Sequence, residues 1–300
     1  MRKQVGRVVT AVAVVGAVIS GCGGPIQAGT AVFVGDHAVP IERVQTELDT
    51  VLAKKDLVAQ FEAQGGSTAD IARSIVTRAV KHDLLTRAAA ERGIVVTDEQ
   101  VDVFIAENGG ADALLDGSMY DLPRLRERVR DDLIAAQLAQ QEVGGLVVTA
   151  DLVAATSRAD ADAAAAALQT GGPEADALFA DPNTSRRGET FVAANVPENA
   201  ATVLFGLPAG AVVSFQPNPQ QSTWIVAKVV DRRTDAPSDP AAVGNISQSQ
   251  LIAIGERLLQ PTADQVGIRV NPRYGVWDPI QMQIVGEDQQ VGTVLPPLAS

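Results

Sequence analysis

The spacing of apolar residues between positions 31 and 142 is the feature that most limits what this chain can fold into. One segment after another carries apolar side chains three or four positions apart, and this period places them on one face of a helix. In the central segment these side chains are those of Val76, Val80, Leu84 and Ala88. Ser67 and Asp70 have the spacing of a helix start, and Gly93 is typical of a helix end. The sequence therefore predicts a long helix that begins near Asp70 and ends before Gly93.

Shorter elements are predicted on both sides of this helix. Residues 31–39 have the pattern of two short strands joined by a Gly-Asp turn, and Pro40 begins a helix. Thr97 and Gln100 form a capping-box pattern that begins another helix, which ends at residues 108–110. A layer of helices has no reactive groups of its own. This part of the chain therefore indicates binding rather than chemistry.

An amphipathic helix is predicted to follow, with Pro123 in its first turn. Its apolar stripe consists of Leu122, Leu125, Val129, Leu133 and Ala136. Its opposite face carries charges, namely Arg126, Glu127, Arg128, Arg130 and Asp131. We expect this charged face to be solvated, with exposed ion pairs that add little to stability.

Gly144 and Gly145 interrupt the helical pattern, and residues 146–234 are predicted to form a small α+β domain. Its expected elements are a strand at 147–155, an alanine-rich helix at 159–169, a loop at 181–188 and paired strands at 212–215 and 224–230. The predicted fold class is therefore mainly α, with an α+β insert.

The remainder of the chain divides into three predicted parts. Residues 235–245 are expected to be a linker. Residues 246–285 are expected to form a helix, shortened or kinked at Pro261, and then a strand. Residues 286–300 are expected to be a frayed tail.

Residues 1–21 have the pattern of an export signal. Three basic residues precede an apolar run at 8–19, which is too short to span a bilayer as a mature helix. The run ends in Ile-Ser-Gly followed by Cys22, and this resembles the bacterial lipobox. The resemblance implies that the Cys22 sulfur carries a diacylglyceryl group and that residues 22–30 are a lipidated tether on the extracytoplasmic side of the cell membrane. The alternative is an ordinary signal peptide that happens to contain a cysteine.

Charge and cysteine content exclude several classes of function. Removal of residues 1–21 takes away three basic residues and no acid, which changes the formal charge from −12 to −15. Such a surface repels phosphate backbones, so we expect no nucleic-acid partner. Cys22 is the only cysteine, which excludes an internal disulfide and a cysteine metal site. The only histidines are His37 and His82, with no tight carboxylate cluster in the sequence, so we expect no metal and no cofactor.

Three stretches carry a resemblance to a known family. They are residues 31–41 (Ala-Val-Phe-Val-Gly-Asp-His-Ala-Val-Pro-Ile), residues 84–101, which contain Gly-Ile-Val-Val-Thr-Asp, and residues 270–278 (Val-Asn-Pro-Arg-Tyr-Gly-Val-Trp-Asp). With the lipobox, they make the chain resemble the SurA/PrsA group of secreted chaperone-foldases, and residues 31–145 resemble the SurA-type N-terminal domain. The resemblance implies that the N-terminal helices and residues 246–285 fold together into one chaperone module.

The same resemblance implies that residues 146–234 are a degenerate parvulin-like domain, the insert that carries prolyl isomerase activity in this group. Parvulins keep a histidine on the first strand and another on the last strand, packed in one hydrogen-bonded site. Here the first strand reads Thr-Ala-Asp-Leu-Val-Ala and the last reads Trp-Ile-Val-Ala-Lys, and no histidine follows His82. The family's glycine-rich loop is reduced to residues 185–191. These departures predict that no catalytic residues are present.

Three functions remain open from the sequence. The first is a noncatalytic chaperone that binds unfolded or newly exported polypeptides, for which no contact residues are assigned and the oligomeric state is unknown. The second is an active prolyl cis–trans isomerase with a divergent site, in which Phe205 and Trp224 supply an apolar wall. The third is a structural lipoprotein subunit of an envelope complex.

Overall fold

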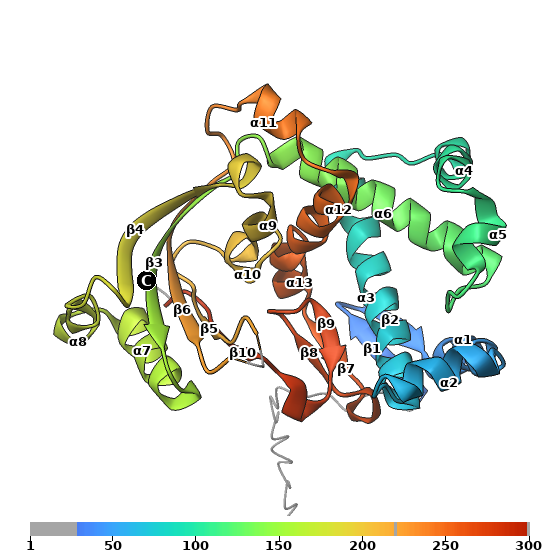
Figure 1. The fold of residues 1–300 in the computed structure, drawn as a ribbon, viewed down its shortest axis with the longest axis horizontal. Helices are drawn as coiled ribbons and strands as arrows, with labels where there is room; N and C mark the ends of the chain where they lie inside the picture. Colours follow the sequence, from blue (N-terminus) through green and yellow to red (C-terminus); the bar gives the residue numbers. More distant parts are fainter. Residues whose placement is uncertain (1–28, 219–220, 299–300) are drawn as a thin grey trace, which may run out of the picture.

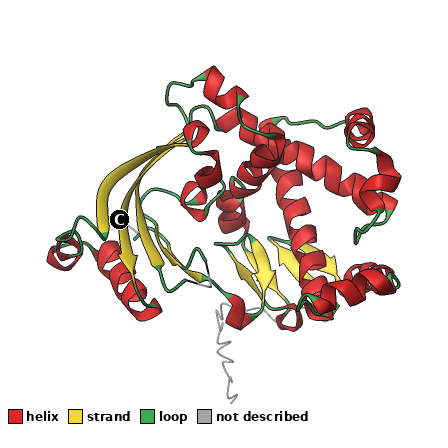
Figure 2. Ribbon diagram, in the orientation of Figure 1, coloured by secondary structure: helices red, strands yellow, loops and turns green. Residues whose placement is uncertain are grey.

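The computed structural model describes residues 29–218 and 221–298; Cys22 and the predicted signal peptide lie outside them. The described chain has a mixed architecture of about 52% helix and 20% strand. Helices lie on one side of the molecule, and a curved sheet lies on the other (Figures 1 and 2).

The N-terminal part is helical, and local sequence signals determine its boundaries. Its helices are α1 (Ile41–Leu52), α2 (Lys55–Ala63), α3 (Thr68–Arg92), α4 (Asp98–Glu107), α5 (Gly110–Leu115) and α6 (Leu122–Glu142). Ser67 and Asp70 form the predicted capping box of α3, and Gly93 ends that helix in the left-handed conformation, with φ of 64°. The capping box of Thr97 and Gln100 begins α4 as predicted.

The predicted N-terminal hairpin is present and is completed from far along the chain. Strands β1 (Thr30–Val34) and β2 (His37–Pro40) pair antiparallel, and β7 (Ile268–Val270) pairs with the other edge of β1. The sheet order is therefore β2-β1-β7.

A curved five-stranded sheet forms the second part of the molecule (Figure 2). Its strands are β3 (Val147–Ala155), β4 (Ser185–Val192), β5 (Val212–Phe215), β6 (Trp224–Arg233) and β10 (Gly292–Leu295). The order is β10-β5-β6-β3-β4, and every neighbouring pair is antiparallel. Helices α7 (Arg158–Thr170) and α8 (Pro173–Ala177) cover one face, while α9 (Pro197–Ala200) and α10 (Val203–Gly206) lie at the other.

Three sequence predictions about this part of the chain were wrong. Residues 185–191, expected within a reduced loop, belong to the edge strand β4. The expected frayed tail contains β10, because its backbone pairs with β5 and its Leu295 packs with α7. The expected linker at 235–245 contains α11 (Pro240–Gly244) and is anchored at its start, where the Ala236 amide donates a hydrogen bond to the Gly145 carbonyl.

The segment after the linker lies against the N-terminal helices. It contains α12 (Gln248–Arg257), α13 (Gln260–Val266) and the hairpin of β8 (Val276–Asp278) and β9 (Gln283–Val285). Pro261 divides the predicted helix in two by standing in the first turn of α13, where its missing N–H has no cost. Helix α12 packs on α6, and β9 packs on α3.

Two residues of α12 explain how closely this segment packs. Gly255 lies so near α6 that a Cβ at this position would overlap the Ala135 carbonyl. Arg257 is buried, and its guanidinium donates to the carbonyls of Ala201, Pro279 and Ile280, with the Pro279 oxygen at 3.0 Å. Burial lowers the pKa of Arg257 to about 10. One hydrophobic core therefore runs from the helices into the sheet, and Arg257 links three segments within it.

Candidate peptide-binding site

The first and last strands of the predicted insert, β3 and β6, lie side by side. Leu152 pairs with Ala227, and Ala154 pairs with Ile225. The neighbouring residues Val153 and Val226 pack against α7. Because side chains alternate along a strand, Leu152, Ala154 and Ile225 face away from α7, on the opposite side of the sheet.

A shallow pocket of about 250 Å³ lies where these strands meet the start of β4. Apolar side chains of β3 and β6 form its floor: Leu152, Ala154 and Ile225. Asn183, Thr184 and Arg186 contribute a polar rim. The rim is held in place because the Ser185 hydroxyl donates to the Asp181 carbonyl at 2.7 Å, and the Asn183 amide donates to the Asp181 carboxylate at 2.9 Å.

The chemistry of this pocket is that of an apolar binding surface. The histidines expected of an active isomerase on the first and last strands of the insert are missing from β3 and β6, which are neighbours here. The facing pairs at the pocket are Leu152 with Ala227 and Ala154 with Ile225, and none of these side chains can donate or accept a proton. Asp151 faces Lys228 on the same two strands, but neither residue lines the pocket. Only Arg186 among the lining residues is charged. An apolar floor with a polar rim suits the capture of an apolar side chain from an extended segment.

The structure separates the two aromatic residues considered for a divergent isomerase site. Phe205 is fully buried in the main core, at the face of the sheet opposite α7. Trp224 packs on the α7 side, with the Arg158 guanidinium 5.9 Å from its ring centroid. They therefore do not form one apolar wall, and that part of the isomerase hypothesis was wrong.

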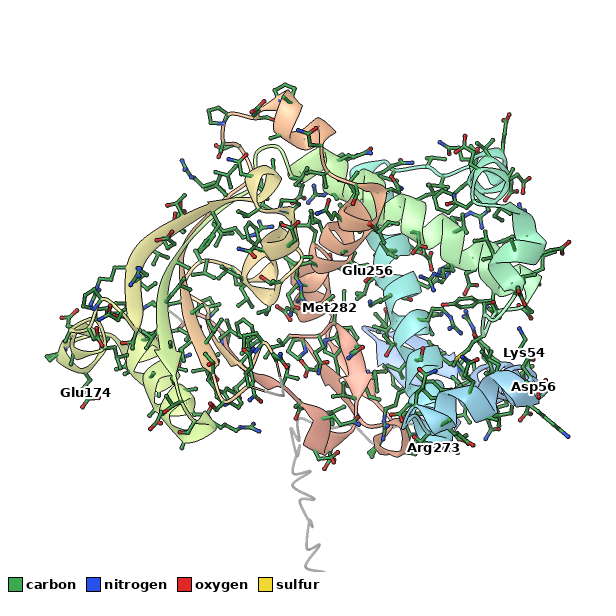
Figure 3. The ribbon with its side chains drawn as sticks, viewed as in Figure 1. Lys54, Asp56, Glu174, Glu256, Arg273 and Met282 are labelled. Atoms are coloured by element: carbon green, nitrogen blue, oxygen red, sulfur yellow. The ribbon has the colours of Figure 1, made fainter. Side chains whose placement is uncertain are left out.

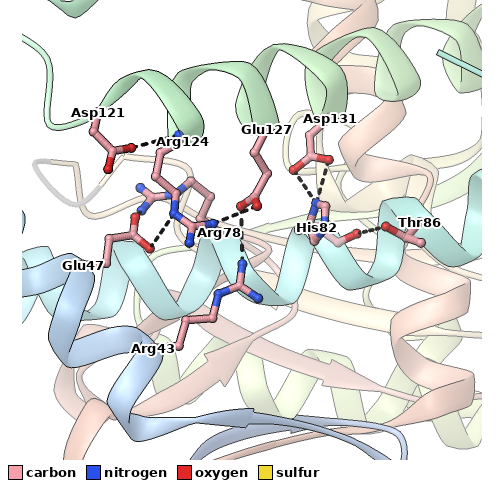
Figure 4. Close-up of polar contacts among 9 residues, drawn as sticks. All are labelled: Arg43, Glu47, Arg78, His82, Thr86, Asp121, Arg124, Glu127 and Asp131. Atoms are coloured by element: carbon pink, nitrogen blue, oxygen red, sulfur yellow. Dashed lines mark hydrogen bonds and ion pairs between the residues drawn. The ribbon is translucent and has the colours of Figure 1, made fainter. Parts of the chain in front are cut away.

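The charged face predicted for α6 is partly buried, because α1 and α3 pack against it (Figure 4). The Nδ1 atom of His82 lies 2.9 Å from Asp131, whose side chain is only 10% exposed. The Glu47 carboxylate forms an ion pair with the Arg78 guanidinium and lies 3.7 Å from the guanidinium of Arg124. The Arg124 guanidinium also lies 2.8 Å from the Glu127 carboxylate. The sequence missed this network because His82 and Asp131 stand 49 positions apart and no local spacing connects them.

A polar cleft of about 340 Å³ continues from this network toward α12. Lys81 on α3 and Glu256 on α12 are paired across it at 2.7 Å, and Glu256 projects toward α3 in Figure 3. The hydrogen bond to Asp131 raises the pKa of His82, although partial burial acts in the opposite direction. Burial raises the pKa of Asp132 to about 6, against the nearby charge of Arg128.

The raised pKa of Asp132 predicts a loss of stability with rising pH. The folded carboxyl holds its proton to a higher pH than the unfolded one, so folding becomes less favourable between about pH 4 and pH 6. We expect Asp132→Asn to increase the free energy of unfolding by about 2 kcal/mol near pH 8 and to change it little near pH 4. Urea unfolding of both proteins at the two pH values measures the difference.

The matched control is Asp116→Asn, which removes one negative charge at the exposed end of α5. This variant should follow the wild-type pH profile. Equal pH dependence of wild type and Asp132→Asn would contradict the assignment of the loss to Asp132.

Within residues 29–218 and 221–298, no helix is both long and apolar enough to cross a bilayer. In the same ranges no group of three or more histidine, cysteine, aspartate or glutamate side chains is arranged to hold a metal ion.

No family model matches this chain, and no curated protein matches it. Among solved structures, it is similar to the foldase protein PrsA from Streptococcus pneumoniae, with 11% identity, coverage of 82% of this chain and 97% of that chain, and a TM-score of 0.27. It is also similar to the foldase protein PrsA from Lactococcus lactis, with 11% identity, coverage of 82% of this chain and 96% of that chain, and a TM-score of 0.26. At these values the similarity establishes neither a shared fold nor a shared function.

Proposed function

We propose that this protein is a membrane-anchored, extracytoplasmic factor that binds unfolded polypeptides without catalysing a reaction. The pocket between β3 and β6 carries this proposal. It offers apolar side chains on its floor and hydrogen-bonding groups on its rim, and the facing pairs at the pocket, Leu152 with Ala227 and Ala154 with Ile225, lack proton-transfer groups. Binding of short apolar segments is the activity that such a surface supports.

Sequence composition supports the same proposal in two ways. The lipobox-like segment with Cys22 would hold the protein at the cell membrane, where exported chains emerge unfolded. The formal charge of −15 that remains after removal of residues 1–21 keeps the protein soluble and gives it an attraction for basic segments.

A charged substitution in the pocket provides the test. Ala154 is exposed on the pocket floor, so Ala154→Asp places a carboxylate there without disturbing the core. We expect this variant to suppress the aggregation of a denatured model client, such as reduced insulin, about tenfold less effectively than the wild type, because binding would bury an unpaired charge. Light scattering against protein concentration measures the effect.

Val230→Asp is the matched control, because Val230 is 50% exposed on β6 and does not line the pocket. It should suppress aggregation as well as the wild type. Equal performance of the Ala154→Asp variant would show that clients do not use this pocket.

Prolyl cis–trans turnover measured on a proline peptide series separates this proposal from the isomerase alternative. We expect peptide binding without turnover above background, since the side chains of β3 and β6 that line the pocket carry no group that can polarise the amide. Turnover that disappears in Ala154→Asp would make the protein an enzyme and refute a noncatalytic role.

A further inference from the structure

A second hollow is formed by residues far along the chain from those of the first pocket, where the three-stranded sheet approaches the two-stranded sheet. It has a volume of about 490 Å³ and lies between α13, β7 and β8. Its walls are mostly apolar and include Ile268 and Val270 of β7 and Trp277 of β8. Strand β7 belongs to the three-stranded sheet and β8 to the two-stranded sheet, and the two strands do not pair with each other. We call this hollow the β7–β8 groove.

Within residues 29–218 and 221–298, the edge of β7 that faces away from β1 pairs with no other strand. On the side of β1, the Gly35 amide donates to the Gly267 carbonyl, and the Asn271 amide donates to the Ala31 carbonyl, both at 2.9 Å. Backbone groups alternate in direction along an antiparallel strand. The N–H and C=O groups of Ile268 and Val270 therefore point away from β1.

Among the described strands, β8 pairs only with β9, so its other edge has no strand partner. Trp277 of β8 stands opposite Ile284 of β9. The Ile284 amide donates outward to the Thr77 hydroxyl on α3 at 2.8 Å, so this pair of residues shares no backbone hydrogen bonds. The N–H and C=O of Trp277 consequently point away from β9. Two unpaired strand edges thus border an apolar groove.

One charged side chain lines the groove, and its negative charge favours a ligand with a basic group. The Asp264 carboxylate stands on α13 and is the only charged group among the lining residues. Its Oδ1 accepts a hydrogen bond at 2.8 Å from Gln260, which is fully buried. In the part of the chain that the structure describes, its Oδ2 has no hydrogen-bond partner. A cationic side chain complements this carboxylate, and the acidic chain as a whole attracts one.

We propose that the β7–β8 groove binds an extended polypeptide segment that alternates apolar residues with lysine or arginine. The segment adds a strand to the free edge of β7 by pairing with Ile268 and Val270. Its apolar side chains pack on Trp277, and a basic side chain meets Asp264. This inference rests on the proposed function and adds a second binding site to it. The second site recognises its ligand differently, because backbone pairing gives affinity without requiring a fixed sequence.

The chain contains a built-in reporter for this site. Trp224 and Trp277 are its only tryptophans, so Trp224→Phe leaves Trp277 as the sole source of tryptophan emission. The full-length protein with this substitution is titrated with a capped peptide in which valine alternates with lysine. We expect a saturable blue shift of the Trp277 emission as the peptide covers its partly buried ring.

Two changes separate strand addition from loose hydrophobic contact. Two analogues carry N-methyl groups on alternate backbone nitrogens, in opposite phases. One of them should bind at least about tenfold more weakly than the other, because it lacks the N–H groups that face β7. Asp264→Asn in the Trp224→Phe background should weaken binding of the lysine peptide about three- to tenfold and should not weaken binding of a glutamate version. Asp116→Asn is the matched control, because it removes the same charge far from the groove and should leave both affinities unchanged.

Three results would overturn the proposal: no emission change on peptide addition, equal binding of both methylated analogues, or equal binding of the lysine peptide to the Asp264→Asn variant. Its failure is distinguishable from failure of the pocket on the five-stranded sheet. Ala154→Asp tests only that pocket and should leave the Trp277 titration unchanged.

Discussion

Gly255→Leu is expected to destabilise the protein by about 3 kcal/mol or more, a large part of the stability of a typical domain. Gly255 lies in the contact between α12 and α6, where even a Cβ would overlap the Ala135 carbonyl. Backbone cannot move aside as a flexible side chain can, so the two helices must separate. The separation exposes the apolar contacts of Ile254 and Ala135, both fully buried.

Gly255→Ala provides a sharper version of this test. Alanine favours a helix over glycine by about 1 kcal/mol, so an isolated α12 would become more stable. We expect the opposite in the whole protein, with a lower midpoint of urea denaturation. Gly244→Ala is the control, because Gly244 ends α11 in open space and its substitution should leave the midpoint unchanged or slightly raised. A stabilised Gly255→Ala variant would contradict the close approach of α12 and α6.

Cys22→Ala is expected to release nearly all of the protein from the membrane. Each methylene of an acyl chain contributes about 0.8 kcal/mol when it is buried in a bilayer, and two chains give stable anchoring. Separation of membrane and soluble fractions by centrifugation, followed by immunodetection, measures the redistribution.

The mass of the mature N-terminal peptide completes the Cys22 test. A wild-type peptide that begins at Cys22 and carries acyl chains is the expected result. Gln27→Ala, in the same predicted tether, should remain in the membrane fraction. Sedimentation of Cys22→Ala with membranes would show that the protein is held there by something other than a lipid on this sulfur.

The amino-acid sequence by itself determined the helical elements of the N-terminal part. The capping boxes at Ser67 and Thr97 and the left-handed Gly93 act through residues within four positions of one another. The same locality made β3 and the pairing of β5 with β6 predictable, because each strand is a short run rich in β-branched and apolar residues. Signals that depend on neighbours along the chain can be read without knowledge of the fold.

Only the tertiary structure decided where distant segments meet. Strand β10 looked like a tail, since a four-residue strand has no local signal and exists because β5 offers it an edge. Asp131 looked solvated until α3 covered it and placed His82 beside it. The sheet pocket and the β7–β8 groove likewise arise from residues of separate segments. Such contacts depend on burial and pairing across long sequence separations, and a pattern in one stretch of sequence contains no information about its distant partner.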